Sequence, residues 1–197
     1  MFHRHSRDRS LLVAGLGNPG PGYARTRHNV GAVLVEMLAS RCGADLRRVR
    51  GQIRSGDCHL EGKSVALAIP TTFMNESGPP VARLLRKAGA KPESLLVVHD
   101  ELDLPLGRVR LKSGGGTGGH RGLESIASSL RSRDFLRLRI GIGRPPVGVE
   151  PREFVLRPFT PDERPVLEKS MDAALEVLPL LVSKGLEAAQ TRLHTAS

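Results

Sequence analysis

Aromatic side chains are scarce in this sequence of 197 residues, which has no tryptophan, one tyrosine and five phenylalanines. A protein that binds nucleic acid by stacking bases on aromatic rings needs more of them, so the scarcity counts against that mode of binding. The two cysteines, Cys42 and Cys58, show neither metal-binding spacing nor a disulfide framework. The cytoplasm is therefore the expected compartment.

Long apolar runs are also missing. No stretch approaches the roughly 20 apolar residues of a membrane span, and residues 1–10 lack the apolar centre of a secretory signal. The length suits one domain. We expect no membrane association, a flexible basic tail over 1–9, a domain over 10–190 and a C-terminal tail over 191–197.

Positive charge, by contrast, is abundant. Lysine and arginine number 30 against 20 acidic residues, which gives a formal net charge of +10. An excess of this size is typical of proteins that bind a polyanion, and nucleic acid is the favoured partner. Most of the charge is arginine, which suits bidentate contacts to phosphate. The alternative is that the charge only keeps a small enzyme in solution.

Segments typical of strands and of helices alternate along the chain. Apolar runs and apolar–polar alternation predict strands over 11–14, 52–60, 65–69, 95–99, 108–112 and 135–142. Helical spacing of apolar residues predicts helices over 29–39, 80–88, 123–130 and 161–184, with an irregular stretch over 147–160 and a polar tail after 184. This order predicts an α/β domain with a mostly parallel or mixed sheet.

Polar side chains gather in loops that follow the predicted strands. Asn18 and His28 follow the strand at 11–14, Asn75 follows the strand at 65–69, and Asp100 follows the strand at 95–99. In α/β sheets, ligands bind beyond the carboxyl ends of the strands. We therefore expect these loops to converge on one pocket.

These residues suit a hydrolytic reaction. His28 can transfer a proton near neutral pH, and the carboxylate of Asp100 could fix the tautomer of its ring. Asn18 and Asn75 can hold a substrate carbonyl, an amine or an attacking water. No serine or cysteine lies in a Gly-x-Ser-x-Gly nucleophile elbow, so water is the expected nucleophile.

Other interpretations remain open for single residues. His28 could be structural, and Asn18 could serve a turn. A metal hypothesis would use His99, Asp100, Asp103 and His120, but their spacing matches no standard metal pattern.

Two glycine motifs resemble nucleotide-binding loops. Gly15-x-Gly17-x-x-Gly20 has the spacing of a dinucleotide fingerprint, but the prolines at 19 and 21 block the helix which that site requires. The glycine-rich stretch at 114–119 lacks the Gly-Lys-Ser/Thr ending of a P-loop.

Taken together, the motifs resemble the signature of bacterial peptidyl-tRNA hydrolases. The resemblance rests on Gly-Leu-Gly-Asn-Pro-Gly-x-x-Tyr-x-x-Thr-Arg-His-Asn-x-Gly at 15–31, Pro-Thr-Thr-Phe-Met-Asn-Glu-Ser-Gly at 70–78 and His-Asp-Glu-Leu-Asp-Leu-Pro at 99–105. Gly-Gly-Gly-x-Gly-Gly-His at 114–120 and Arg-Leu-Arg-Ile-Gly-Ile-Gly-Arg-Pro at 137–145 complete it, in the family's order.

The resemblance implies an esterase that frees peptides from tRNA after stalled or aborted translation. It implies that His28 is the general base, that Asp100 keeps it basic, and that Asn18 distinguishes blocked from free amino groups. It further implies a substrate site containing Tyr23, Phe73, Asn75 and Arg121, and a clamp on the tRNA 5′-phosphate formed by Lys112 and Arg139.

The resemblance also carries expectations about the whole protein. It implies no metal or organic cofactor, a monomer in the cytoplasm, and a single domain built on a twisted mixed sheet flanked by helices.

Two residues depart from the family pattern. Arg121 stands where the family usually has an asparagine, and an arginine cannot accept a hydrogen bond. Ile69 stands where a lysine is common. The first departure leaves open an alternative, a non-catalytic RNA-binding relative of the same fold.

Overall fold

The structure is a computed structural model that describes residues 9–49 and 52–195. Most of the predicted basic tail, residues 1–8, lies outside the described residues. Residue 9 already belongs to the first strand, so the predicted boundary at 9 falls one residue inside the sheet.

A seven-stranded sheet, counted over the described residues, has the strand order β2-β3-β4-β1-β5-β7-β6. Its centre is parallel: β1 (Arg9–Gly15) pairs with β4 (Lys63–Pro70) and β5 (Leu95–Glu101), and β5 pairs with β7 (Leu136–Gly141). Antiparallel strands extend both edges, namely β3 (Ile53–Leu60), β2 (Arg47–Val49) and β6 (Val109–Ser113). The sheet is mixed, as expected.

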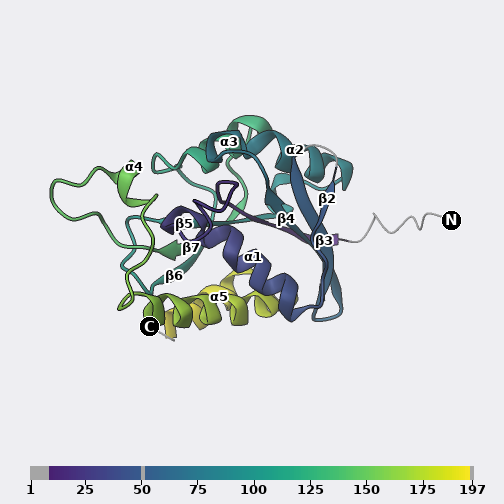
Figure 1. The fold of residues 1–197 in the computed structure, drawn as a ribbon. Helices are drawn as coiled ribbons and strands as arrows, with labels where there is room; N and C mark the ends of the chain where they lie inside the picture. Colours follow the sequence, from purple (N-terminus) through teal and green to yellow (C-terminus); the bar gives the residue numbers. More distant parts are fainter. Residues whose placement is uncertain (1–8, 50–51, 196–197) are drawn as a thin grey trace.

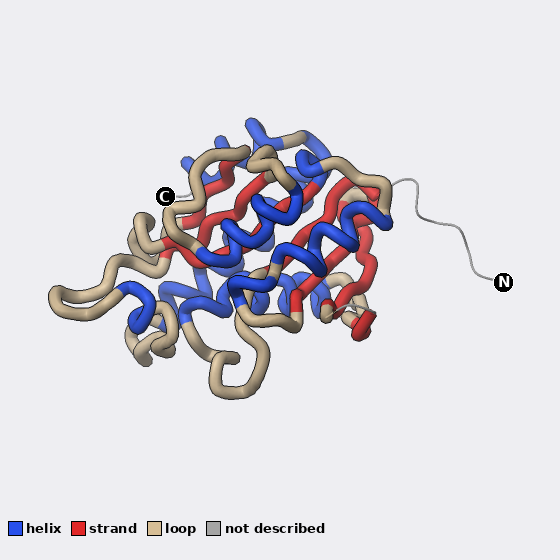
Figure 2. Tube along the Cα trace, turned by 90° about the horizontal axis from the view of Figure 1, so that it is seen from above, coloured by secondary structure: helices blue, strands red, loops and turns tan. Residues whose placement is uncertain are grey.

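Helices cover both faces of the sheet (Figures 1 and 2). On one face lie α1 (Val30–Arg41), α5 (Arg164–Lys184) and α6 (Leu186–Thr195), and on the other lie α2 (Gly78–Lys87) and α3 (Arg121–Leu130). Buried side chains of β1 alternate between the two cores: Val13 packs toward α1 and α5, whereas Leu12 and Ala14 pack toward α2 and α3. Both faces are therefore apolar, which explains the continuous apolar runs of the central strands.

The stretch 147–160, predicted to be irregular, contains one helical turn, α4 (Pro151–Phe154). The short strand β2 is not among the predicted strands. The larger correction concerns the C-terminus, where the predicted polar tail is the helix α6. This helix crosses the predicted boundary at 190 and buries Ala189 and Leu193 in the core, and the Gln190 side chain donates to the Leu111 carbonyl at 2.9 Å. The C-terminal segment therefore belongs to the domain.

The loop after β1 packs directly on the start of α1. A β-carbon on Gly15 would overlap the carbonyl oxygen of Gly31, and one on Gly31 would overlap the carbonyl oxygen of Val98. Glycine at both positions lets the backbones of β1, α1 and β5 approach closely, and this approach places residues 18–29 beside the end of β5.

Candidate active site

A cavity of about 690 Å³ opens where the loops after β1, β4 and β5 meet. Asn18 and His28 come from the first loop, Asn75 from the second, and Asp100 from the end of β5. The predicted convergence of these loops on one pocket is therefore what the structure shows. Residues of α4, of the two positions after it and of the glycine-rich loop complete the walls, among them Pro151, Arg152, Val155, Leu156, Thr117, Gly118 and Gly119.

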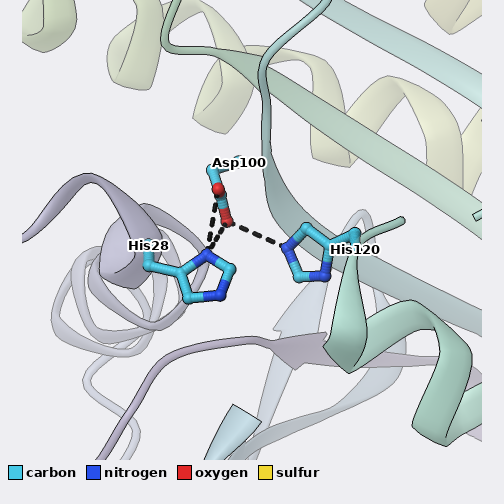
Figure 3. A group of neighbouring side chains, drawn as sticks. All are labelled: His28, Asp100 and His120. Carbon is cyan, nitrogen blue, oxygen red and sulfur yellow. Dashed lines mark hydrogen bonds and ion pairs between the residues drawn. The ribbon is translucent and has the colours of Figure 1, made fainter. Parts of the chain in front are cut away.

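Two histidines converge on one buried carboxylate (Figure 3). His28 Nδ1 lies 2.9 and 3.0 Å from the two oxygens of Asp100, and His120 Nε2 lies 3.0 Å from Oδ1. The Asp100 side chain is only 2% exposed, against 13% for His28. Because an ionised carboxylate only accepts hydrogen bonds, both of these ring nitrogens carry protons and donate them.

The hydrogen bonds fix the tautomers of both rings. His120 is the N-cap of α3, and its Nδ1 accepts from the backbone N–H groups of Gly122 and Leu123. His28 keeps its second nitrogen, Nε2, on the side away from Asp100 (Figure 3), and its ring lines the cavity. With Nδ1 protonated, Nε2 holds the free lone pair that a general base needs.

Burial raises the pKa of Asp100, but the electrostatic interaction and hydrogen bonds with His120 and His28 outweigh this effect and hold the pKa below its ordinary value. The neighbouring His99 is 1% exposed, and burial, together with the adjacent His120, lowers its pKa to about 3. His99 Nδ1 donates to the backbone carbonyl of Asp100 at 2.7 Å. The carboxylate is therefore ionised and His99 is neutral at physiological pH.

Asn18 is held in one orientation. Its side-chain Oδ1 accepts the backbone N–H of Met74 at 2.8 Å. The buried side chain of Asn29 bonds the backbone of Asn18 twice, accepting its N–H at 2.9 Å and donating to its carbonyl at 3.0 Å. Since Oδ1 is occupied, the amide Nδ2 of Asn18 is the group left for a ligand.

The remaining predicted substrate-binding residues lie around the cavity. Phe73, Asn75 and Arg121 line it and are exposed, and Phe73 is 53% exposed despite its apolar ring. Tyr23 is not among the lining residues, but its ring packs edge-on against the Phe73 ring, with the two ring centroids 6.3 Å apart. This pair offers an aromatic surface at the mouth of the cavity.

The two residues of the predicted clamp lie outside the cavity on β6 and β7. In the antiparallel pair of β6 and β7, Lys112 lies opposite Arg137, and Arg110 lies opposite Arg139. These four side chains therefore share one face of the sheet. The other face carries the buried Val109 and Leu111. Lys112 is exposed, whereas Arg139 Nε donates to Glu101 at 2.9 Å.

Two residues that help to build the site have no such role assigned from the sequence. From the sequence, His120 is only a possible metal ligand, because histidine is not among the residues typical of helix N-caps. Arg137 was predicted only to share a strand face with Arg139, yet its buried guanidinium donates to the carbonyls of Gly115 at 2.6 Å and Gly116 at 2.5 Å. This bond pair fixes the glycine-rich wall beside His120.

The four residues of the alternative metal hypothesis do not come together as one group. His28, Asp100 and His120 bring ligand atoms within 4.8 Å of one another, but their hydrogen bonds to one another occupy those atoms. Asp103 lines the same cavity but is not part of this close group, and its exposed carboxylate pairs with Arg144 at 2.6 Å. His28, Asp100 and His120 form a hydrogen-bonded His–Asp–His cluster.

A mixed α/β sheet with a carboxylate-oriented histidine in a cavity at the carboxyl ends of its parallel strands defines an enzyme site suited to general-base hydrolysis. The model of the family "Peptidyl-tRNA hydrolase" matches residues 12–197. The chain belongs to this family. Among the described residues, no helix has the length and apolar character to cross a membrane.

Relatives named peptidyl-tRNA hydrolase match along nearly the whole chain. The Nocardia farcinica protein is 50% identical over 187 residues, which are 93% of this chain and 95% of that protein. The Frankia casuarinae protein is 49% identical over 95% of both chains. The crystal structure of the Acinetobacter baumannii peptidyl-tRNA hydrolase aligns with a TM-score of 0.88 and 39% identity, over 98% of this chain and 97% of that one.

Proposed function

We propose that this protein hydrolyses the ester between a peptide, or an N-blocked amino acid, and the 3′-terminal ribose of tRNA. In this way it would recycle tRNA from peptidyl-tRNA released by stalled or aborted translation. The observation that carries the proposal is the His28–Asp100 pair, with Nε2 of His28 at the cavity surface, in a chain of this family. The net charge of +10 suits a tRNA substrate.

The reaction begins with water as the nucleophile. His28 Nε2 takes a proton from a water in the cavity, and the hydroxide formed attacks the ester carbonyl carbon. Asp100 accepts the Nδ1–H of His28 at 2.9 Å, so its negative charge stabilises the imidazolium that forms. The imidazolium then returns the proton to the departing ribose 3′-oxygen, which releases tRNA and the free carboxylate.

Asn18 gives the site its preference for blocked amino groups. With Oδ1 held by the Met74 N–H, Nδ2 donates to an acyl carbonyl oxygen on the amino end of the substrate. A free aminoacyl-tRNA carries an ammonium group there, which is itself a donor and gains nothing from a second donor. Binding energy at this position is thus available only to peptidyl or N-blocked substrates.

The exposed residues around the cavity bind the two ends of the scissile ester. Phe73 and Tyr23 provide an aromatic surface for the terminal adenosine, and Asn75 provides polar contacts to the ribose or the peptide backbone. Arg121, at the first position of α3, contacts a phosphate of the 3′ end or the ester oxygen. Lys112 and Arg139 hold the tRNA 5′-phosphate from β6 and β7.

For the whole protein we propose a cytoplasmic monomer that needs no metal or organic cofactor. The alternative of a non-catalytic RNA-binding relative rests on Arg121 alone, and the complete His28–Asp100 pair argues against it.

The test is release of an N-acetylated amino acid from tRNA, with chelator present, by the wild-type protein and by Arg121→Asn. Cleavage by both supports the hydrolase and makes Arg121 a tuning residue. No cleavage by the wild type, with activity gained in Arg121→Asn, would show that this chain is the binding relative instead.

A further inference from the structure

The residue before His28, Arg27, is buried although it is charged. Its side chain is 5% exposed, and its guanidinium carbon lies over two aromatic rings, 4.3 Å from the centroid of Phe154 and 4.6 Å from that of Phe159. Its Nη2 donates to Glu163 at 2.7 Å, while Nε and Nη1 find no acceptor among the described residues. The side chain does not line the cavity, so it does not meet a substrate there.

Stability alone does not account for an arginine at this position. Buried donors without acceptors are unfavourable, and replacing a buried ion pair by apolar side chains of similar size is often neutral or stabilising. An apolar residue would also pack between Phe154 and Phe159. What arginine adds is a planar charged group that contacts two aromatic rings and an acid at one edge, which restricts its orientation.

The partner of Arg27 is itself anchored. Glu163 precedes α5, and its carboxylate also accepts the backbone N–H of Thr160 at 2.8 Å. Burial raises the pKa of Glu163, but the hydrogen bonds from Arg27 and Thr160 outweigh it and hold the pKa below its ordinary value. The carboxylate thus stays charged, and it links Arg27 to the start of the longest helix of the core.

The backbone makes the same connection around Arg27. The N–H of Arg27 donates to the carbonyl of Arg157 at 3.1 Å, and the N–H of His28 donates to the carbonyl of Val155 at 2.9 Å. Val155 lines the cavity. The segment that carries His28 and the chain that follows α4 are therefore joined at Arg27 and at His28.

We propose that Arg27 is a positioning residue for the reaction: it locks the His28 loop to the α4–α5 segment and so fixes the base relative to Asp100 and to the α4 wall. Asn29 anchors His28 inward, toward Asn18, and Arg27 anchors it outward, toward Glu163. This inference rests on the proposed function. A displacement of a reacting group by about 1 Å can cost roughly 100-fold in rate, so a loosened loop affects catalysis before it affects folding.

The test compares Arg27→Met, Arg27→Lys and Glu163→Gln in steady-state cleavage of N-acetylated aminoacyl-tRNA. Arg41→Met is the matched control, because Arg41 also pairs with an acid of α5, Asp172, but at an exposed site on the far end of α1. Thermal unfolding of every variant is measured alongside, and kinetics are recorded well below the unfolding midpoint.

For Arg27→Met we expect kcat to fall about 100-fold, with KM changed by less than about threefold. Arg27→Lys keeps the charge but not the planar group, so it should lose about 10-fold in kcat. The double variant Arg27→Met with Glu163→Gln should be no slower than Arg27→Met, because both act through one link. Arg41→Met should match the wild type.

Failure of this inference is distinguishable from failure of the proposed function. If the wild type does not cleave, the proposed function falls, and this inference falls with it. If the wild type cleaves and Arg27→Met and Glu163→Gln retain its kcat, only the positioning role is overturned. Should Arg27→Met fail to fold, unchanged kcat in both Arg27→Lys and Glu163→Gln overturns it as well.

Discussion

Replacing Asp100 by asparagine changes one atom at the centre of the His–Asp–His cluster. In the wild type, Oδ1 accepts from both His28 and His120, and Oδ2 accepts from His28 at 3.0 Å. An amide offers one accepting oxygen and one donating NH₂ group. Whichever way the new amide turns, its NH₂ faces a ring N–H, and one of the two histidines has to give way.

The structure indicates that His28 is the one that gives way. The Nδ1 of His120 accepts the backbone N–H groups of Gly122 and Leu123, which holds its proton on Nε2. The tautomer of His28 is held through Asp100, and within the described part of the chain no donor to its second nitrogen, on the side away from Asp100, holds it as well. In Asp100→Asn, His28 therefore shifts its proton to Nε2 and loses the lone pair that activates water.

For Asp100→Asn we expect kcat to fall by about 10³- to 10⁴-fold, the size of effect that a wrong tautomer has in other histidine-based hydrolases. Raising the pH should not restore the rate, since the tautomer and not the protonation state is at fault. The assay is single-turnover release of an N-acetylated amino acid from tRNA, with Asp172→Asn as an exposed control outside the cavity. A loss below about 10-fold, or recovery at high pH, would refute the reasoning, because either result would mean that Asp100 does not set the tautomer.

Three further outcomes follow from the same geometry. His28→Ala should lose about 10²- to 10⁴-fold in rate, measured by single-turnover kinetics, with nearly unchanged tRNA affinity, measured by filter binding. A loss of tRNA affinity as large as the loss of rate would contradict this. Lys112→Ala and Arg139→Ala should weaken tRNA binding and flatten its dependence on salt, and salt slopes equal to that of the wild type would remove both residues from the clamp. Burial lowers the pKa of His99 from 6.5 to about 3, so below pH 6.5 the unfolded chain takes up a proton that the folded protein refuses, and stability falls as pH falls. Relative to His99→Asn, the wild type should lose about 1.4 kcal/mol per pH unit between pH 6 and 4.5 in chemical unfolding experiments, and parallel curves would show that His99 does not titrate in this way.

The residues of the site could be predicted better than their mutual arrangement. The sequence marks His28 and Asp100 because it predicts each in a polar loop that follows an apolar strand, although Asp100 is in fact the penultimate residue of β5. These two segments meet because β1 and β5 are neighbours in the sheet. Their close approach depends on long-range packing of the glycines at 15 and 31, which no local pattern reveals. The sequence thus predicts the chemistry but not the distances.

The missed elements have a similar cause. Leu186, Ala189 and Leu193 have helical spacing, but the segment is short and polar, and α6 is stabilised mainly by packing against α5 and β6. The role of His120 depends on capping α3 and on reaching Asp100 at the same time, and the second contact joins residues 20 positions apart with β6 between them. Tertiary contacts decide both cases.

The central claim is that a base-activated water cleaves the ester only when the amino end is blocked. The most direct measurement is the initial rate on N-acetylated aminoacyl-tRNA and on the same aminoacyl-tRNA left unblocked, for the wild type and for His28→Ala. We predict rapid cleavage of the blocked substrate alone by the wild type and near-background rates for His28→Ala. Equal cleavage of both substrates, or full activity in His28→Ala, would contradict the account.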